Sequence, residues 1–162
     1  MRSFTTDAGV DVLTFGGTKN GLMYGEAVVF LDPELGERAR FVRKQTTQLA
    51  SKMRYIGAQF ASALTDGLWL RNAAHANAMA RLLADGLAGV DGVEVTSAPE
   101  VNAVFAALPS AGAVEDLQAW SFVWDWDRAR HEVRCMTSWA TTPADVERFV
   151  AGVEAVAARH RT

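Results

Sequence analysis

Residues 10–31 read VDVLTFGGTKNGLMYGEAVVFL, two apolar runs on either side of a glycine-rich turn. The runs, 10–15 and 26–31, are rich in β-branched and aromatic residues and are bounded by turn residues. Short runs of this kind predict buried β-strands. The sequence therefore predicts a strand–turn–strand unit with Lys19 at the tip of the turn.

Lys19 is the residue of this turn that can carry chemistry. A lysine held where two buried strands meet is expected to be either paired with an acid or made reactive by its burial. Reactive amines form Schiff bases with carbonyl groups. On spacing alone, a lysine among three glycines is more typical of a tight turn with a solvated side chain. The turn is not a nucleotide-binding P-loop, because Asn20 and Gly21 follow the lysine instead of Ser or Thr and a helix.

The composition indicates a folded, acidic protein. Of the 162 residues, 49% are hydrophobic and 22% are charged, which excludes disorder, and the net charge of −3 argues against nucleic-acid binding. The single cysteine, Cys135, excludes an internal disulfide and fits a cytoplasmic location. We find no targeting signal, and the longest apolar run, 27–31, is too short to span a membrane. We therefore expect a soluble cytoplasmic protein without membrane or nucleic-acid partners.

The rest of the chain alternates helical and strand patterns. We expect a helix from Pro33 to about Leu64 with either a break or close packing at Gly57, and a long helix capped by Asp66. We expect strands at 93–95 and 101–108, a helix at 110–118, a hairpin of 122–126 with 132–139, and a last helix capped by Thr142. The predicted domains are residues 1–66, a connecting helix at 67–90, and a small α/β domain at 91–162.

The first block lacks an obvious partner within the sequence. Two strands alone are marginally stable in water, and the runs at 10–15 and 26–31 are apolar enough to lie inside a larger sheet. Residues 1–31 are therefore expected to need a further surface to pack against.

Several segments of the chain resemble one family of enzymes, the low-specificity L-threonine aldolases. The resemblance extends essentially from end to end and is most specific at residues 11–30. It is also carried by Lys44-Gln45, residues 48–54, 69–73 and 75–80, Val133-Arg134 and residues 137–139. It implies an α/β fold: the C-terminal part of a fold-type-I pyridoxal-phosphate-dependent transferase-like large domain, followed by an α/β small domain. In that family the lysine lies past the middle of the chain, so this chain resembles the C-terminal half and is expected to be inactive alone.

The same resemblance assigns roles to five residues. Lys19 would be the catalytic residue and would hold pyridoxal 5′-phosphate as a Schiff base, with Thr18 near its phosphate. Arg43 and Lys44 fall where the family reaches a cofactor phosphate, and Arg134 where it binds the substrate carboxylate. From the residues alone, Thr18 is equally a turn hydroxyl, Arg43 and Lys44 a solvated helix face, and Arg134 an exposed strand arginine. No metal site is expected.

The implied reaction is retro-aldol cleavage of β-hydroxy-α-amino acids such as L-threonine or L-allo-threonine to glycine and an aldehyde. The alternatives are another fold-type-I pyridoxal enzyme, such as an aminotransferase or a β-eliminating lyase, and a non-catalytic α/β oligomerisation module. Beyond a small amino-acid substrate, the expected partners are further copies of the chain, as a dimer or tetramer, or a complementing N-terminal half.

Overall fold

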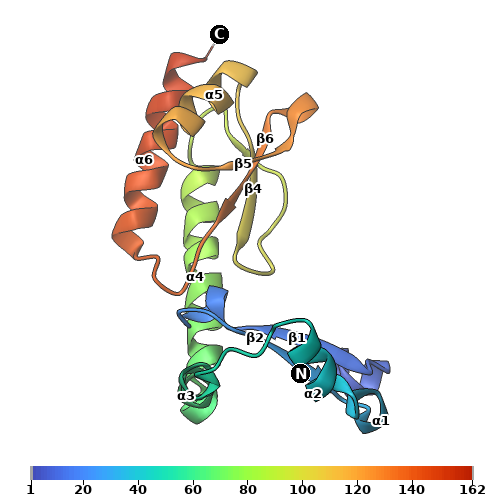
Figure 1. Ribbon diagram of the computed structural model, residues 1–162. Coiled ribbons are helices and arrows are strands. Elements are labelled where there is room, and N and C mark those ends of the chain that lie inside the picture. The colour runs from blue at the N-terminus through green and yellow to red at the C-terminus, as the bar shows by residue number, and fades with distance from the viewer. Residues whose placement is uncertain (1, 162) are drawn as a thin grey trace. The chain divides into compact units, whose positions relative to one another are not determined.

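The computed structural model describes residues 2–161 as helices and two antiparallel sheets (Figure 1). The chain divides into two compact units, the first within residues 1–69 and the second within 70–162. This mixture of helices and strands confirms the predicted α/β class.

The first unit contains the predicted strand–turn–strand unit. Two 3-10 helices, Arg2–Phe4 and Thr6–Ala8, precede it. Strand β1 (Val12–Gly16) pairs antiparallel with β2 (Glu26–Phe30), so that the turn between them carries Lys19. The predicted strand–turn–strand order is confirmed, but the expectation that the strands are buried is wrong for this chain, because every side chain of β1 and β2 is exposed or half-buried.

Three helices follow the hairpin where the sequence predicted one. They are α1 (Pro33–Gly36), α2 (Ala39–Gln45) and α3 (Met53–Leu64). Neither alternative expected at Gly57 is found: Gly57 lies inside α3, a Cβ built on it would meet no atom within 4 Å, and the chain leaves the helix after Gln45 instead. Thr47 adopts a left-handed backbone conformation there, with φ of 59°. No glycine or proline in this part of the sequence indicates the end of the helix.

The long helix α4 (Leu68–Ala88) begins at the end of the first unit and lies mostly in the second. Its buried side chains recur every three or four residues, as an amphipathic helix requires. The expectation that Asp66 caps this helix is wrong, since Asp66 lies inside the 3-10 turn Thr65–Gly67 with φ of 53°. None of the helices described in 2–161 is long and apolar enough to cross a membrane.

The sheet of the second unit has four antiparallel strands in the order β3-β4-β6-β5. Their bounds are Glu94–Val95 for β3, Ala103–Ala107 for β4, Trp124–Asp127 for β5 and Glu132–Met136 for β6. Strands β5 and β6 form the predicted hairpin, which turns through the 3-10 helix Arg128–Arg130. A β-bulge lies between Asp125 and Asp127.

Three helices pack on one face of this sheet, α4 together with α5 (Ala111–Trp120) and α6 (Pro143–Arg159) (Figure 1). Helix α6 begins with the predicted cap, in which Asp145 N donates to Thr142 Oγ1 at 3.2 Å and Thr142 N donates to Asp145 Oδ2 at 3.0 Å. The core between these helices and the sheet includes Leu83, Leu87, Val104, Leu117, Val133, Cys135 and Val153.

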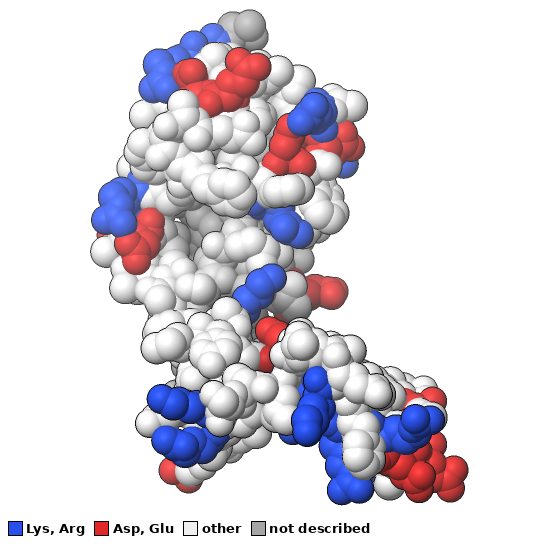
Figure 2. All heavy atoms as spheres, in the orientation of Figure 1, with Lys and Arg blue, Asp and Glu red and all other residues white. Residues whose placement is uncertain are grey.

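The face of the protein drawn in Figure 2 is largely uncharged. On the face drawn in Figure 2, Lys, Arg, Asp and Glu side chains lie in small groups separated by wide uncharged areas. Exposed apolar residues of the first unit include Val12, Val28, Leu35, Phe41 and Val42. In the second unit they include Phe122, Trp124, Trp126, Met136 and Trp139.

Candidate functional site

The turn that carries Lys19 is fixed by close contacts of its glycines. Gly17 N donates to Gly25 O at 2.9 Å and closes the loop just beyond the strands. Gly25 has a φ of 138°, and a Cβ built on it would lie 3.0 Å from side-chain atoms of both Ile56 and Phe60. Gly21 ends the 3-10 helix Thr18–Asn20 with φ of 100°. Residues other than glycine rarely adopt such φ values, so the backbone path of the turn depends on glycine at positions 21 and 25.

Side chains beside the turn hold it against the rest of the first unit. Asn20 Nδ2 donates to Trp69 O at 3.1 Å, and Met23 N donates to Gln59 Oε1 at 2.8 Å. The Phe15 ring, just before the turn, meets Trp69 edge-on with centroids 5.5 Å apart. The turn is therefore anchored on both sides of Lys19, although the sequence did not identify Asn20 or Trp69 as supports.

Lys19 itself projects from this anchored turn. Its side chain is exposed and forms no ion pair or hydrogen bond with any residue in 2–161. The expectation of a paired or buried amine is thus not met. Thr18 is also exposed, and its hydroxyl has no hydrogen-bond partner within the same residues. The two side chains offer a free amine and a free hydroxyl on one fixed turn, groups that fit an aldehyde and a phosphate.

Arg43 and Lys44 lie elsewhere in the first unit. Both are exposed in the last turn of α2, a helix that follows the end of the hairpin opposite the Lys19 turn. Among the described residues, no hydrogen bond or ion pair joins them to Thr18 or Lys19. The structure therefore does not bring these four residues together through direct contacts.

Arg134 lies in the second unit, in the middle of β6. It points to the sheet face opposite Val133 and Cys135, which are buried in the core. Its guanidinium carbon lies 5.3 Å from the centroid of the Trp126 ring. Its Nε is shielded from solvent and has no hydrogen-bond partner within residues 2–161. Such a guanidinium can still take a carboxylate in a two-pronged contact.

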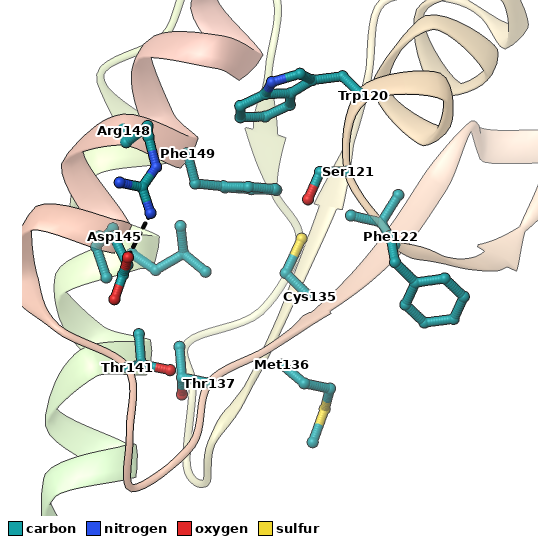
Figure 3. Close-up of a pocket in the computed structure, with 13 residues that line it drawn as sticks. Trp120, Ser121, Phe122, Cys135, Met136, Thr137, Thr141, Asp145, Arg148 and Phe149 are labelled. Atoms are coloured by element: carbon teal, nitrogen blue, oxygen red, sulfur yellow. Dashed lines mark hydrogen bonds and ion pairs between the residues drawn. The ribbon is translucent and has the colours of Figure 1, made fainter.

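A cavity of about 440 Å³ opens on the other side of β6 (Figure 3). Trp120, Phe149 and Cys135 border it, together with the exposed ion pair of Arg148 and Asp145. Burial raises the pKa of the Cys135 thiol to about 12, so this thiol is not a nucleophile at neutral pH. No group of three metal-ligating side chains occurs in the part of the chain that the structure describes.

The curated proteins that this chain resembles share one name. No family model matches the chain. Over 152 residues it is 43% identical to a low specificity L-threonine aldolase of a Pseudomonas strain, which covers 94% of this chain and 44% of the relative. Over 141 residues it is 46% identical to a Pseudomonas aeruginosa protein of the same name, which covers 87% of this chain and 40% of the relative.

A solved structure gives the same result. The threonine aldolase of Leishmania major matches 91% of this chain and 44% of its own with a TM-score of 0.80 and 29% identity. The resemblance inferred from the sequence is confirmed, and this chain spans less than half the length of these relatives.

Proposed function

We propose that this chain, a relative of the low specificity L-threonine aldolases, forms the C-terminal, lysine-bearing part of a pyridoxal 5′-phosphate-dependent lyase. Its reaction would be cleavage of β-hydroxy-α-amino acids such as L-threonine or L-allo-threonine to glycine and an aldehyde. The observation that carries this proposal is the free amine of Lys19 on a glycine-fixed turn, in a chain 43% and 46% identical to such aldolases.

Lys19 and Thr18 are the residues that would hold the cofactor. Lys19 Nζ would supply the amine that reacts with the aldehyde of the cofactor, and the Thr18 hydroxyl would be available to its phosphate. The turn contributes rigidity, because its contacts with Ile56, Phe60 and Trp69 fix the direction from which the amine approaches. When bound, pyridoxal phosphate supplies an acceptor for the electron pair released by Cα–Cβ cleavage.

Arg134 would bind the α-carboxylate of the amino-acid substrate. A guanidinium pairs with a carboxylate through two parallel hydrogen bonds, which fixes the orientation of the Cα substituents as well as the position of the substrate. Arg134 forms no ion pair with any residue in 2–161, which supports this role.

In the proposed assembly a second polypeptide packs against the first unit of this chain. Exposed apolar residues on the hairpin and on α2 support a partner for the first unit, either further copies of the chain or a complementing N-terminal part. Arg43 and Lys44, on α2, would reach a cofactor phosphate within that assembly. A cytoplasmic location is supported by the single cysteine, which is buried and free.

Labelling of the lysine tests the proposal. The sequence has only three lysines, at positions 19, 44 and 52, so borohydride reduction after addition of pyridoxal phosphate can be mapped completely. Modification of Lys19 blocks tryptic cleavage there and yields the peptide 3–38 with the reduced cofactor attached. Equal labelling of all three lysines would contradict a specific site.

A second assay separates the aldolase from other pyridoxal enzymes. The 162-residue chain is mixed with the complementary part of a Pseudomonas relative, and glycine release from L-threonine and L-allo-threonine is measured. Glycine formation is expected from the mixture and not from the chain alone. Release of a keto acid instead would favour an aminotransferase or a β-eliminating lyase.

A further inference from the structure

The outer face of the second unit's sheet carries an arginine among aromatic rings. Alternation along β6 places Arg134 on this face, directly across from Phe105 of β4 and from Trp124 of β5. Helices cover the opposite face, where Val133 and Cys135 are buried. Arg134 therefore lies at the centre of a sheet surface that none of these helices covers.

Trp126 is the ring that contacts the guanidinium. The centre of the guanidinium lies 5.3 Å from the Trp126 centroid, within the range of a cation–π interaction. Phe105 meets the same indole at a centroid distance of 5.0 Å and an interplanar angle of 60°. Trp126 thus packs against Phe105 and contacts the guanidinium of Arg134. It occupies the β-bulge between Asp125 and Asp127, so no residue of β6 lies directly opposite it.

The carboxylate that could compete for Arg134 is already engaged. Glu132 lies two residues earlier on the same face of β6 and is buried. Its Oε1 accepts a short hydrogen bond from Thr96 Oγ1, and it forms no ion pair with Arg134. Among residues 2–161 no carboxylate therefore pairs with Arg134, and an incoming carboxylate could accept from the terminal N–H groups of its guanidinium.

We propose that Trp126 is a positioning residue that holds Arg134 by its aromatic face and leaves the N–H groups of the guanidinium free for a substrate carboxylate. An aromatic face restrains a guanidinium without using its hydrogen-bond donors, whereas an acidic neighbour would occupy the donors that the substrate needs. The choice of substrate group rests on the proposed function. The restraint by Trp126 rests on the geometry of the sheet alone.

The first experiment measures the order of the Arg134 side chain in the 162-residue chain. The Arg134 Nε–H signal is assigned with Arg134→Lys, and its heteronuclear NOE is compared in wild type, Trp126→Leu, Trp126→Phe and Trp124→Leu. Trp124 is the matched control, because it is as exposed as Trp126 (54% and 52%) but does not stack on the guanidinium. Backbone spectra report whether each variant is folded.

Trp126→Leu is expected to lower the NOE of Arg134 toward that of the exposed Arg130, while Trp126→Phe retains most of the wild-type value. Trp124→Leu is expected to leave it unchanged. A wild-type NOE in folded Trp126→Leu would overturn the proposal, as would an equal loss in Trp124→Leu.

The second experiment titrates sodium acetate, with sodium chloride at the same ionic strength as the control. Acetate is expected to move the Arg134 Nε–H signal more than chloride does, and Trp126→Leu to weaken that response roughly threefold to tenfold. If Arg134 is ordered by Trp126 but acetate and chloride act alike, the carboxylate role of Arg134 under the proposed function fails. The positioning by Trp126 would still stand on the first experiment.

Discussion

The ring of Trp120, at the end of α5, lies directly over Gly152 of α6: a Cβ built on Gly152 would overlap the ring carbon Cη2. Trp120 also stacks on Phe149, with centroids 5.7 Å apart. Gly152→Ala must therefore displace the indole from this stack. We expect a loss of about 1–3 kcal/mol in the free energy of unfolding, measured by urea titration with circular dichroism.

Gly89→Ala is the matched control for this change. Gly89 is exposed in the same unit, and a Cβ there would meet only Gly86 O, at an ordinary distance of 3.5 Å. The urea concentration at the unfolding midpoint of Gly89→Ala should stay close to that of the wild type. Equal midpoints for the two variants would contradict the contact between α5 and α6.

The Cys135 thiol should be unreactive in the native protein. With a pKa raised to about 12 by burial, almost no thiolate is present at pH 8, so alkylation by iodoacetamide should be slow until denaturant is added. The unfolded thiol, with a pKa of about 8.5, loses its proton first as pH rises. Stability from this group is therefore complete below about pH 8.5 and declines toward pH 12, a decline that Cys135→Ala should reduce. Native alkylation as fast as that of the unfolded chain would refute the burial.

Asp116 should make the second unit sensitive to acid. Hydrogen bonds from His160, at 3.0 Å, and from Arg159, at 3.1 Å, lower the pKa of this carboxyl. A lowered pKa gives stability that is present above the unfolded value, about 3.9, and is lost as pH falls below it. Melting temperatures between pH 2 and 6 should show a smaller acid-induced decrease in Asp116→Asn than in wild type. Asp91→Asn, at an exposed partner of Arg161, is the control and should follow the wild type.

Replacing Lys19 should remove activity without unfolding the chain. Because the side chain is exposed and unpaired within residues 2–161, Lys19→Ala should keep the wild-type circular dichroism spectrum and melting temperature. In a reconstituted assembly it should release no glycine above background, whereas Lys52→Ala, at another exposed lysine, should remain active. Normal turnover of Lys19→Ala would show that another group carries the chemistry.

Local sequence signals predicted the elements that depend on local chemistry. The paired apolar runs around Lys19 gave the hairpin, and the cap of Thr142 with Asp145 gave the start of α6, because hydrogen bonds within four residues determine such starts. The left-handed residues Thr47 and Asp66 were missed because neither is a glycine, the residue that usually marks such a position; at Thr47 the end of α2 is closed by Gln48 N, which donates to Arg43 O at 2.9 Å.

The candidate site could be predicted only in part from the sequence, because some of its contacts join residues that are distant along the chain. Lys19 and Arg134 were named mainly through the resemblance to the aldolases, because their positions alone indicate a solvated turn lysine and an exposed strand arginine. The stacking of Trp126 on Arg134 could not, because it depends on a bulge in β5 and on a ring of β4 distant in sequence.

The burial of the only cysteine has a practical consequence for labelling this protein. A cysteine introduced at an exposed position such as Ala129 would be the only rapidly reacting thiol, so a fluorophore or spin label would attach there without removal of Cys135. Two introduced cysteines, one at Ala129 and one at exposed Lys52, would then report the distance between the two units in solution. The wild-type core can thus be kept intact in every labelled form.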